Sequence, residues 1–146
     1  MGYSQAYSAY RETGVKTASQ GKLVVMLYDE AVKQLNFALA HFSADEKIGA
    51  QHIEAFNKNI LKTQEIITEL MVALDMEAGG DISKNLMSLY IFFNKELLNA
   101  NISRDKKKIG FVCDMMSQLR DAWSVASASA GATPAPAVHT GIDING

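Results

Sequence analysis

Apolar residues recur at intervals of three and four positions in four successive stretches of the chain, which is the period of an amphipathic α-helix. No stretch alternates apolar and polar residues with the period of a β-strand. Four such helices with short connections predict an all-α fold, an antiparallel up-and-down four-helix bundle. The stripes expected to face the core are Val24, Leu27, Tyr28, Ala31, Leu35, Ala38, Leu39 and Phe42; Ile53, Phe56, Ile60, Ile67, Leu70 and Leu74; Ile82, Leu86, Leu89, Tyr90, Phe93, Leu97 and Ala100; and Ile109, Val112, Met116, Leu119, Trp123 and Ala126.

Capping residues and glycines indicate where these helices begin and end. The first helix should span about 20–42, and the fourth should end near Ala126. Gly79-Gly80 should end the second helix, because glycine readily takes the positive φ that is common just after a helix. The expected N-caps, whose short side chains accept hydrogen bonds from free main-chain N–H groups, are Thr17 or Ser19, Asp81 or Ser83, and Asp105.

The two ends of the chain differ from the bundle domain, which is expected over residues 17–126. Residues 1–16 contain three tyrosines that would align on one side of a short helix: Tyr3, Tyr7 and Tyr10. Because tyrosine buries a large ring and keeps its hydroxyl in water, this docking segment fits either a removable cap or a helix packed permanently on the bundle. Residues 127–146 are small, contain both prolines and lack periodicity, which predicts a disordered tail.

The third helix has more apolar residues than one core-facing stripe accounts for. Met87, Ile91, Phe92 and Leu98 fall outside its stripe, and apolar residues on several sides of a helix indicate burial on more than one side. A chain of 146 residues has few elements of its own to cover a second side, so we expect a partner. The alternative, that these side chains fill the core, stays open for each. The candidate partner-binding residues, chosen from the apolar positions beside the stripes, are Leu23, Met26, Met71, Met87, Ile91 and Leu98.

Composition argues against nucleic acid and membranes as partners. With a net charge of −2 and a single basic run, Lys106–Lys108, the chain lacks the footprint of a nucleic-acid-binding protein. The longest apolar run, Leu23–Leu27, is far too short for membrane insertion, and no secretory signal is recognisable. The single cysteine, Cys113, cannot form an internal disulfide, so a reducing, cytoplasmic location is expected.

Patterns for catalysis or metal binding are absent from the sequence. A di-iron bundle needs a glutamate three residues before a ligand histidine, and none of His41, His52 and His139 has one. There is no haem-attachment motif and no glycine-rich phosphate loop. Cys113 lies on the apolar stripe of the fourth helix, where an inert buried thiol is favoured over a nucleophile. We therefore expect no enzymatic activity, no cofactor and no metal.

Three groups of residues form motifs along the chain: Tyr7-x-x-Tyr10 with Val15–Ser19 and Leu23–Asp29; the signature Leu74–Leu86; and Ala100-Asn101 with Leu119–Trp123. In order and at the expected spacings, these motifs resemble those of the flagellin-specific export chaperones, the FliS family. The similarity extends from about Tyr7 to Ala126. Gln20 and Lys22 replace a proline and a glutamate that the family usually has, and the lost capping should cost about 1 kcal/mol or less.

The resemblance implies a cytosolic chaperone that binds the disordered C-terminal segment of flagellin. Such a protein would prevent premature polymerisation and help to deliver flagellin to the flagellar export gate. The resemblance also suggests that the N-terminal segment covers apolar surface when no client is bound, and that the chaperone is a monomer or weak homodimer. The residues alone leave a second interpretation open, a structural or adaptor bundle that uses its spare apolar surface to form a homo-oligomer.

Overall fold

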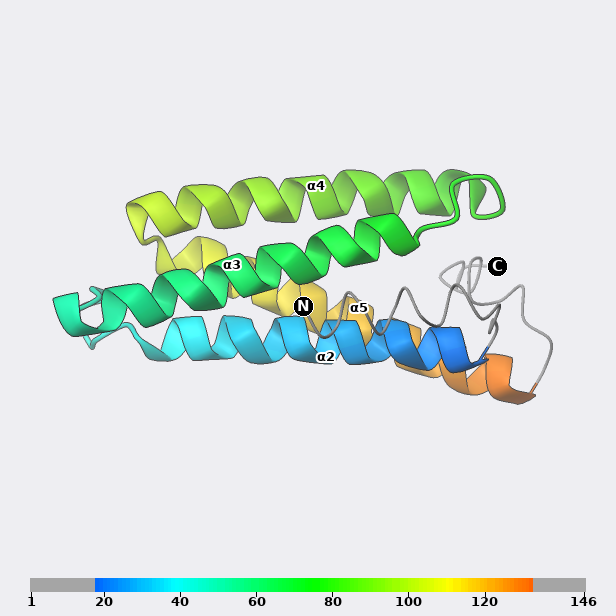
Figure 1. The fold of residues 1–146 in the computed structure, drawn as a ribbon, viewed down its shortest axis with the longest axis horizontal. Helices are drawn as coiled ribbons and strands as arrows, with labels where there is room; N and C mark the ends of the chain where they lie inside the picture. The colour runs from blue at the N-terminus through cyan, green and yellow to red at the C-terminus, as the bar shows by residue number, and fades with distance from the viewer. Residues whose placement is uncertain (1–17, 133–146) are drawn as a thin grey trace.

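The computed structural model describes residues 18–132, with the side chains of 21–128 among them. This part of the chain contains four helices, α2 (Ala18–Ala40), α3 (Ala50–Ala73), α4 (Gly80–Ser103) and α5 (Lys106–Ala132). Successive helices run in opposite directions along the long axis of the molecule (Figure 1). The all-α, up-and-down four-helix bundle predicted from the apolar periodicity is confirmed.

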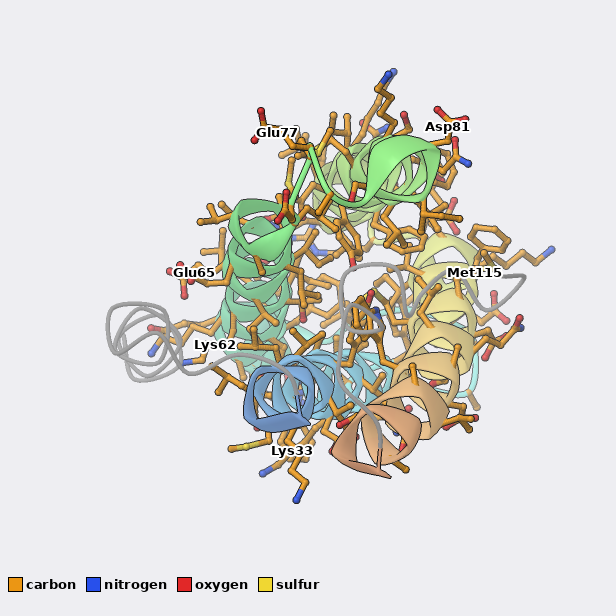
Figure 2. All side chains as sticks on the ribbon, turned by 90° about the vertical axis from the view of Figure 1, so that its right-hand side faces the viewer. Lys33, Lys62, Glu65, Glu77, Asp81 and Met115 are labelled. Carbon is orange, nitrogen blue, oxygen red and sulfur yellow. The ribbon has the colours of Figure 1, made fainter. Side chains whose placement is uncertain are left out.

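Each helix packs against two neighbours around a filled interior (Figure 2). The contacts of α2 with α5 and with α3 are the more extensive ones, whereas α4 makes smaller interfaces with α3 and α5. The charged side chains of Lys33, Glu65 and Asp81 point outward from this arrangement (Figure 2). Because α2 and α4 lie diagonally opposite, their backbones are not neighbours.

The core contains most residues of the predicted stripes, with large side chains from every helix at its centre; Leu23, Val32, Ile66 and Cys113 add to it, whereas Ile53 and Ala126 are not part of it. Tyr28 of α2 and Tyr90 of α4 are buried, and their hydroxyl groups form a hydrogen bond across the diagonal of the bundle. The largest fully buried side chains are Tyr28, Tyr90, Phe56, Phe93, Leu27, Leu35, Ile60, Ile67, Leu70, Leu97 and Ile109.

The connection from α2 to α3 is an ordered turn. The helix ends at Ala40 rather than at Phe42, because the next residues form tighter hydrogen bonds, with the Phe42 N–H donating to Leu39 O. The Ser43 N–H donates to Lys47 O at 2.7 Å, and an isolated bridge pairs Phe42 with Ile48. At the other end of α2, the helix begins at Ala18, so the expected N-cap Ser19 lies inside it, and Thr17 lies outside the described residues.

The α3–α4 connection differs from its prediction. Gly79-Gly80 does not terminate α3, which ends at Ala73, where Leu74 turns to an extended conformation. The turn is instead held by Asp75, whose Oδ1 accepts hydrogen bonds from the N–H groups of the two residues before Gly79. Neither Asp81 nor Ser83 caps α4: its N-cap is Gly79, which has no side chain to cap with, and Ser83 Oγ donates to Asp75 O at 2.9 Å.

The two ends of α5 give one correct and one wrong prediction. Asp105 caps the helix as predicted, since its Oδ1 accepts hydrogen bonds from the N–H groups of Lys107 and Lys108. The predicted helix end at Ala126 is wrong, because α5 continues to Ala132 and buries Ser127. The alanines of this stretch favour a helix even without large apolar side chains. The predicted tail therefore begins later than 127; residues 133–146 lie outside the described part, so their disorder stays a prediction.

Candidate functional site

The six candidate partner-binding residues do not share one environment. Met26, Ile91 and Leu98 are exposed, whereas Met71 and Met87 are partly buried. Leu23 is only 3% exposed and packs in the core, so its proposed place on an exposed groove does not hold for this structure. It precedes the core residues Val24 and Leu27 of α2 on the same side of the helix.

Four apolar residues share one side of α4 as a stripe, with Asn94 and Lys95 between the second and the third. Met87, Ile91, Leu98 and Ile102 are spaced by four, seven and four residues, which places them on one face of a helix. Ile91 is 52% exposed, and Leu98 and Ile102 are exposed as well. Sequence reasoning missed Ile102, although its spacing from Leu98 was a usable signal.

The stripe borders α3, as one hydrogen bond between the two helices shows. Gln64 Nε2 of α3 donates to the main-chain O of Asn94 of α4 at 3.2 Å. Because the helices are antiparallel, this contact brings Leu61 to about the same height as Leu98 along the bundle axis, and Met71 to about the same height as Met87. We call the combined apolar region the α3/α4 surface; its residues are Leu61, Met71, Met87, Ile91, Leu98 and Ile102.

Polar acceptors lie beside the α3/α4 surface. Among the described side chains, the Oδ1 atoms of Asn94 and Asn101 are buried and accept no hydrogen bond. Asn94 lies between Ile91 and Leu98 in α4, and Asn101 directly precedes Ile102; both are on the side of the helix that faces α3. Because these oxygens are buried, a segment on the surface does not reach them, and the α3/α4 surface offers mainly apolar contacts.

Met26 lies on a different surface. It shares the outer face of α2 with Phe37, which is also exposed, and the Lys33 Nζ lies 5.9 Å from the Phe37 ring centroid. Because α2 and α4 are not neighbours, Met26 cannot line the α3/α4 surface. The structure therefore divides the predicted single groove into two apolar regions, the α3/α4 surface and the face of α2 that carries Met26 and Phe37.

The remaining apolar residue off the α4 core stripe is already in contact with a neighbour. The rings of Phe92 on α4 and Phe111 on α5 meet edge to face, with centroids 6.2 Å apart. Each ring is partly exposed, but the pair covers part of its own surface. Tyr3, Tyr7 and Tyr10, which were expected to cover a groove as an N-terminal cap, lie outside the described residues, so that role stays a prediction.

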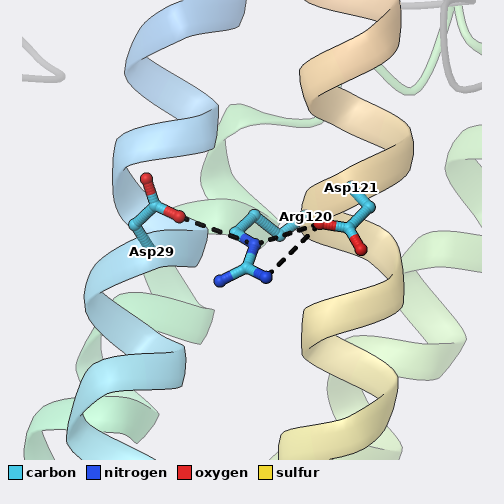
Figure 3. A network of polar contacts seen from close by, with 3 residues as sticks. All are labelled: Asp29, Arg120 and Asp121. Carbon is cyan, nitrogen blue, oxygen red and sulfur yellow. Dashed lines mark hydrogen bonds and ion pairs between the residues drawn. The ribbon is translucent and has the colours of Figure 1, made fainter.

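Exposed charged side chains join α2 and α5 on the outside of the bundle. Arg120 of α5 lies between Asp29 of α2, at 3.6 Å from its Oδ1, and Asp121, at 3.3 Å (Figure 3). All three side chains are at least partly exposed, so the ion pairs contribute little to stability. Burial, followed by the nearby Asp114 carboxylate, raises the pKa of the Cys113 thiol, which keeps it protonated and unreactive.

The described residues contain neither a cluster of three potential metal ligands nor a membrane-spanning helix. No group of three or more His, Cys, Asp or Glu side chains there is arranged to hold a metal ion. None of the described helices combines the length and the apolar character needed to span a membrane.

Comparison with known proteins identifies the family. The model of the family described as "Flagellar protein FliS" matches residues 3–130. A flagellar secretion chaperone FliS of Bacillus subtilis is 30% identical over 126 residues, which cover 86% of this chain and 89% of the relative. The relative from Salmonella typhimurium is 33% identical (82% and 84% covered), and that from Escherichia coli is 31% identical (82% and 85%). These relatives are named as secretion chaperones, not enzymes, and the chain belongs to the FliS family.

Proposed function

We propose that this protein is a cytosolic chaperone that binds the C-terminal segment of flagellin, prevents premature polymerisation and aids delivery to the flagellar export gate. Membership of the FliS family supports the general role in flagellar secretion. The observation that carries the finer proposal is the α3/α4 surface, a helix-length apolar stripe next to a neighbouring helix. An amphipathic client helix can lay its apolar face on such a surface.

The size of the α3/α4 surface bounds the affinity that it can supply. Burying a large apolar side chain completely gains about 1.5–3 kcal/mol, so covering the exposed half of Leu61, Ile91, Leu98 and Ile102 gains about 3–6 kcal/mol, to which the partly buried Met71 and Met87 add less. A micromolar complex needs about 8 kcal/mol after association and client ordering have been subtracted. The client must therefore contact further surface, and the face of α2 with Met26 and Phe37 is the second apolar region available.

The N-terminal segment would act as a removable cap in this proposal. Apparent affinity falls with the fraction of molecules whose binding surface is open. If the segment covers the surface about 99% of the time, a chain that begins at Gly14 should bind client up to roughly 100-fold more tightly. Unchanged affinity with a large loss of stability would instead make residues 1–16 a permanent part of the bundle.

Binding of a flagellin C-terminal peptide, followed by calorimetry and size-exclusion chromatography, tests the main proposal. We expect a one-to-one complex, and we expect Ile91→Asp to weaken it with little change in Tm, because Ile91 is half exposed. Val125→Asp is the matched control, since Val125 is 68% exposed on α5, outside both apolar regions. Equal losses of affinity in the two variants, or unfolding of Ile91→Asp, would contradict the assignment.

The alternative function is a structural or adaptor homo-oligomer that buries the same apolar stripe between copies of the chain. The exposure of Ile91, Leu98 and Ile102 in the single chain is compatible with either function. Sedimentation over a wide range of protein concentrations separates them. A client-binding chaperone should be a monomer or weak homodimer that shifts to the complex when peptide is added, whereas an obligate oligomer keeps its size at all concentrations.

A further inference from the structure

Two histidines meet at the turn between α2 and α3. His41 directly follows α2, and His52 lies in the first turn of α3. Their Nδ1 atoms are 3.2 Å apart, and their ring centroids are 5.2 Å apart. The contact is between like atoms, so one Nδ1 carries a hydrogen and the other offers a lone pair.

A chain of hydrogen bonds fixes which nitrogen of His41 offers the lone pair. The Glu30 carboxylate can only accept, and it receives a hydrogen bond from Gln34 Nε2 at 2.8 Å. Gln34 Oε1 therefore accepts from Asn59 Nδ2 at 3.0 Å, and Asn59 Oδ1 faces His41 Nε2 at 3.1 Å. His41 must donate through Nε2, so its Nδ1 is the unprotonated nitrogen that faces His52.

This arrangement is that of a metal-binding histidine. In metal sites the ligand imidazole usually donates its other N–H to an oxygen acceptor, which fixes the tautomer and orients the ring. Here the acceptor is Asn59 Oδ1, itself held by Gln34. Two imidazole nitrogens bound to one tetrahedral Zn²⁺ at 2.0–2.1 Å lie about 3.3 Å apart, and the observed Nδ1–Nδ1 separation is 3.2 Å.

We propose that His41 Nδ1 and His52 Nδ1 form a two-histidine binding site for a late first-row transition-metal ion, Zn²⁺ or Cu²⁺. The ion takes the place of the hydrogen between the two nitrogens, and His52 then carries its hydrogen on Nε2. The His52 side chain is exposed, so its ring can turn to aim the lone pair at the ion. Imidazole is a preferred ligand of both metals.

The surrounding turn keeps the two histidines in place. The Ser43 N–H and Oγ both donate to Lys47 O, at 2.7 and 2.9 Å. The Phe42 ring, next to His41, packs edge to face on Phe56 of α3 with centroids 5.6 Å apart. The described residues provide no group of three ligands, so water completes the coordination and the site is open and exchangeable. A bound ion would join the end of α2 to the start of α3.

Titration of the full, metal-free chain with Zn²⁺ and with Cu²⁺ tests the site. We expect one-to-one binding by calorimetry, and a rise in Tm with excess ion that EDTA reverses, because an ion that binds only the folded state stabilises it. His41→Gln and His52→Gln should each lower the affinity at least about 10-fold. Asn59→Leu, which removes the orienting acceptor, should lower it about 10- to 100-fold.

Two controls make the result decisive. His139→Gln removes the third histidine of the chain and should leave affinity unchanged. Nitrogen-15 NMR of the histidines should show coordination through Nδ1, not Nε2. The proposal is overturned if the wild-type chain shows no saturable binding, if His52→Gln binds as tightly as the wild type, or if the loss of affinity follows His139.

Discussion

Replacing Tyr90 by phenylalanine removes one hydroxyl from the centre of the bundle and leaves the ring in place. The Tyr90 hydroxyl is hydrogen-bonded to that of Tyr28, and both side chains are almost completely buried. Trp123 is the third polar side chain near Tyr28 and acts on its pKa, although its indole N–H makes no hydrogen bond of good geometry. In the variant, the Tyr28 hydroxyl therefore stays in the core without its main partner.

The expected cost follows from this burial. A net contribution of about 0.5–1.5 kcal/mol is typical of an intramolecular hydrogen bond, and leaving a buried hydroxyl unpaired raises the loss to about 1–3 kcal/mol. The apolar area hardly changes from tyrosine to phenylalanine, so the hydrophobic contribution is nearly constant. We expect the free energy of unfolding of Tyr90→Phe to fall by about 2 kcal/mol.

A double-mutant cycle in urea, followed by circular dichroism, measures the interaction. Tyr28→Phe combined with Tyr90→Phe leaves neither hydroxyl in the core. The loss in the double variant should therefore be smaller than the sum of the single losses by at least about 1 kcal/mol. The urea m-value should not change, since the surface exposed on unfolding is the same. Additive single effects, or a Tyr90→Phe variant within about 0.5 kcal/mol of the wild type, would refute a coupled buried pair.

Three further predictions concern titration, glycines and surface charge. Burial raises the pKa of Tyr28 well above 10, so above pH 10 the unfolded chain loses a proton that the folded chain keeps. In urea unfolding, the free energy of unfolding should therefore fall as the pH rises above about 10, and this effect should be absent below about pH 9. Gly79→Ala should lower the free energy of unfolding by about 1–3 kcal/mol, because a Cβ there would lie 1.7 Å from Ser83 Oγ. Gly110→Ala should raise it by up to about 1 kcal/mol, because a Cβ at that helical position meets open space. Thermal unfolding of the two variants measures the difference. Arg120→Ala should cost about 1 kcal/mol or less at low salt, and less still in 1 M NaCl.

The sequence was sufficient for the fold because the determining signal is local. Apolar spacing within each helix depends on the helical repeat alone, and the predicted stripes form most of the observed core. Where helices stop depends on neighbouring structure. Gly79-Gly80 looked like the end of the second helix, but α3 already ends at Ala73, and a turn held by Asp75 follows it. Residues 127–132 looked structureless in the sequence, yet they continue α5.

The candidate site was less predictable, because exposure depends on where the other helices lie. Leu23 and Met26 are both apolar neighbours of the α2 stripe, and only the directions of α3 and α5 decide that the first is buried and the second exposed. No spacing motif links His41 and His52, which are eleven residues apart and meet through the geometry of a turn. Sequence patterns therefore predict the apolar faces of helices, but they do not predict contacts between residues that a turn brings together.

The unequal helix interfaces also determine which helix separates most easily from the bundle by local unfolding. Because α4 has the smaller interfaces on both sides, separating it from the bundle breaks fewer contacts with other helices than separating α2 would. Local opening is easiest where few apolar contacts are lost, so the amide protons of α4 should exchange with solvent sooner than those of α2. The helix that carries the exposed stripe is thus the most easily displaced one. A segment that binds to both α3 and α4 would hold the two helices together and so slow the exchange of the α4 amide protons.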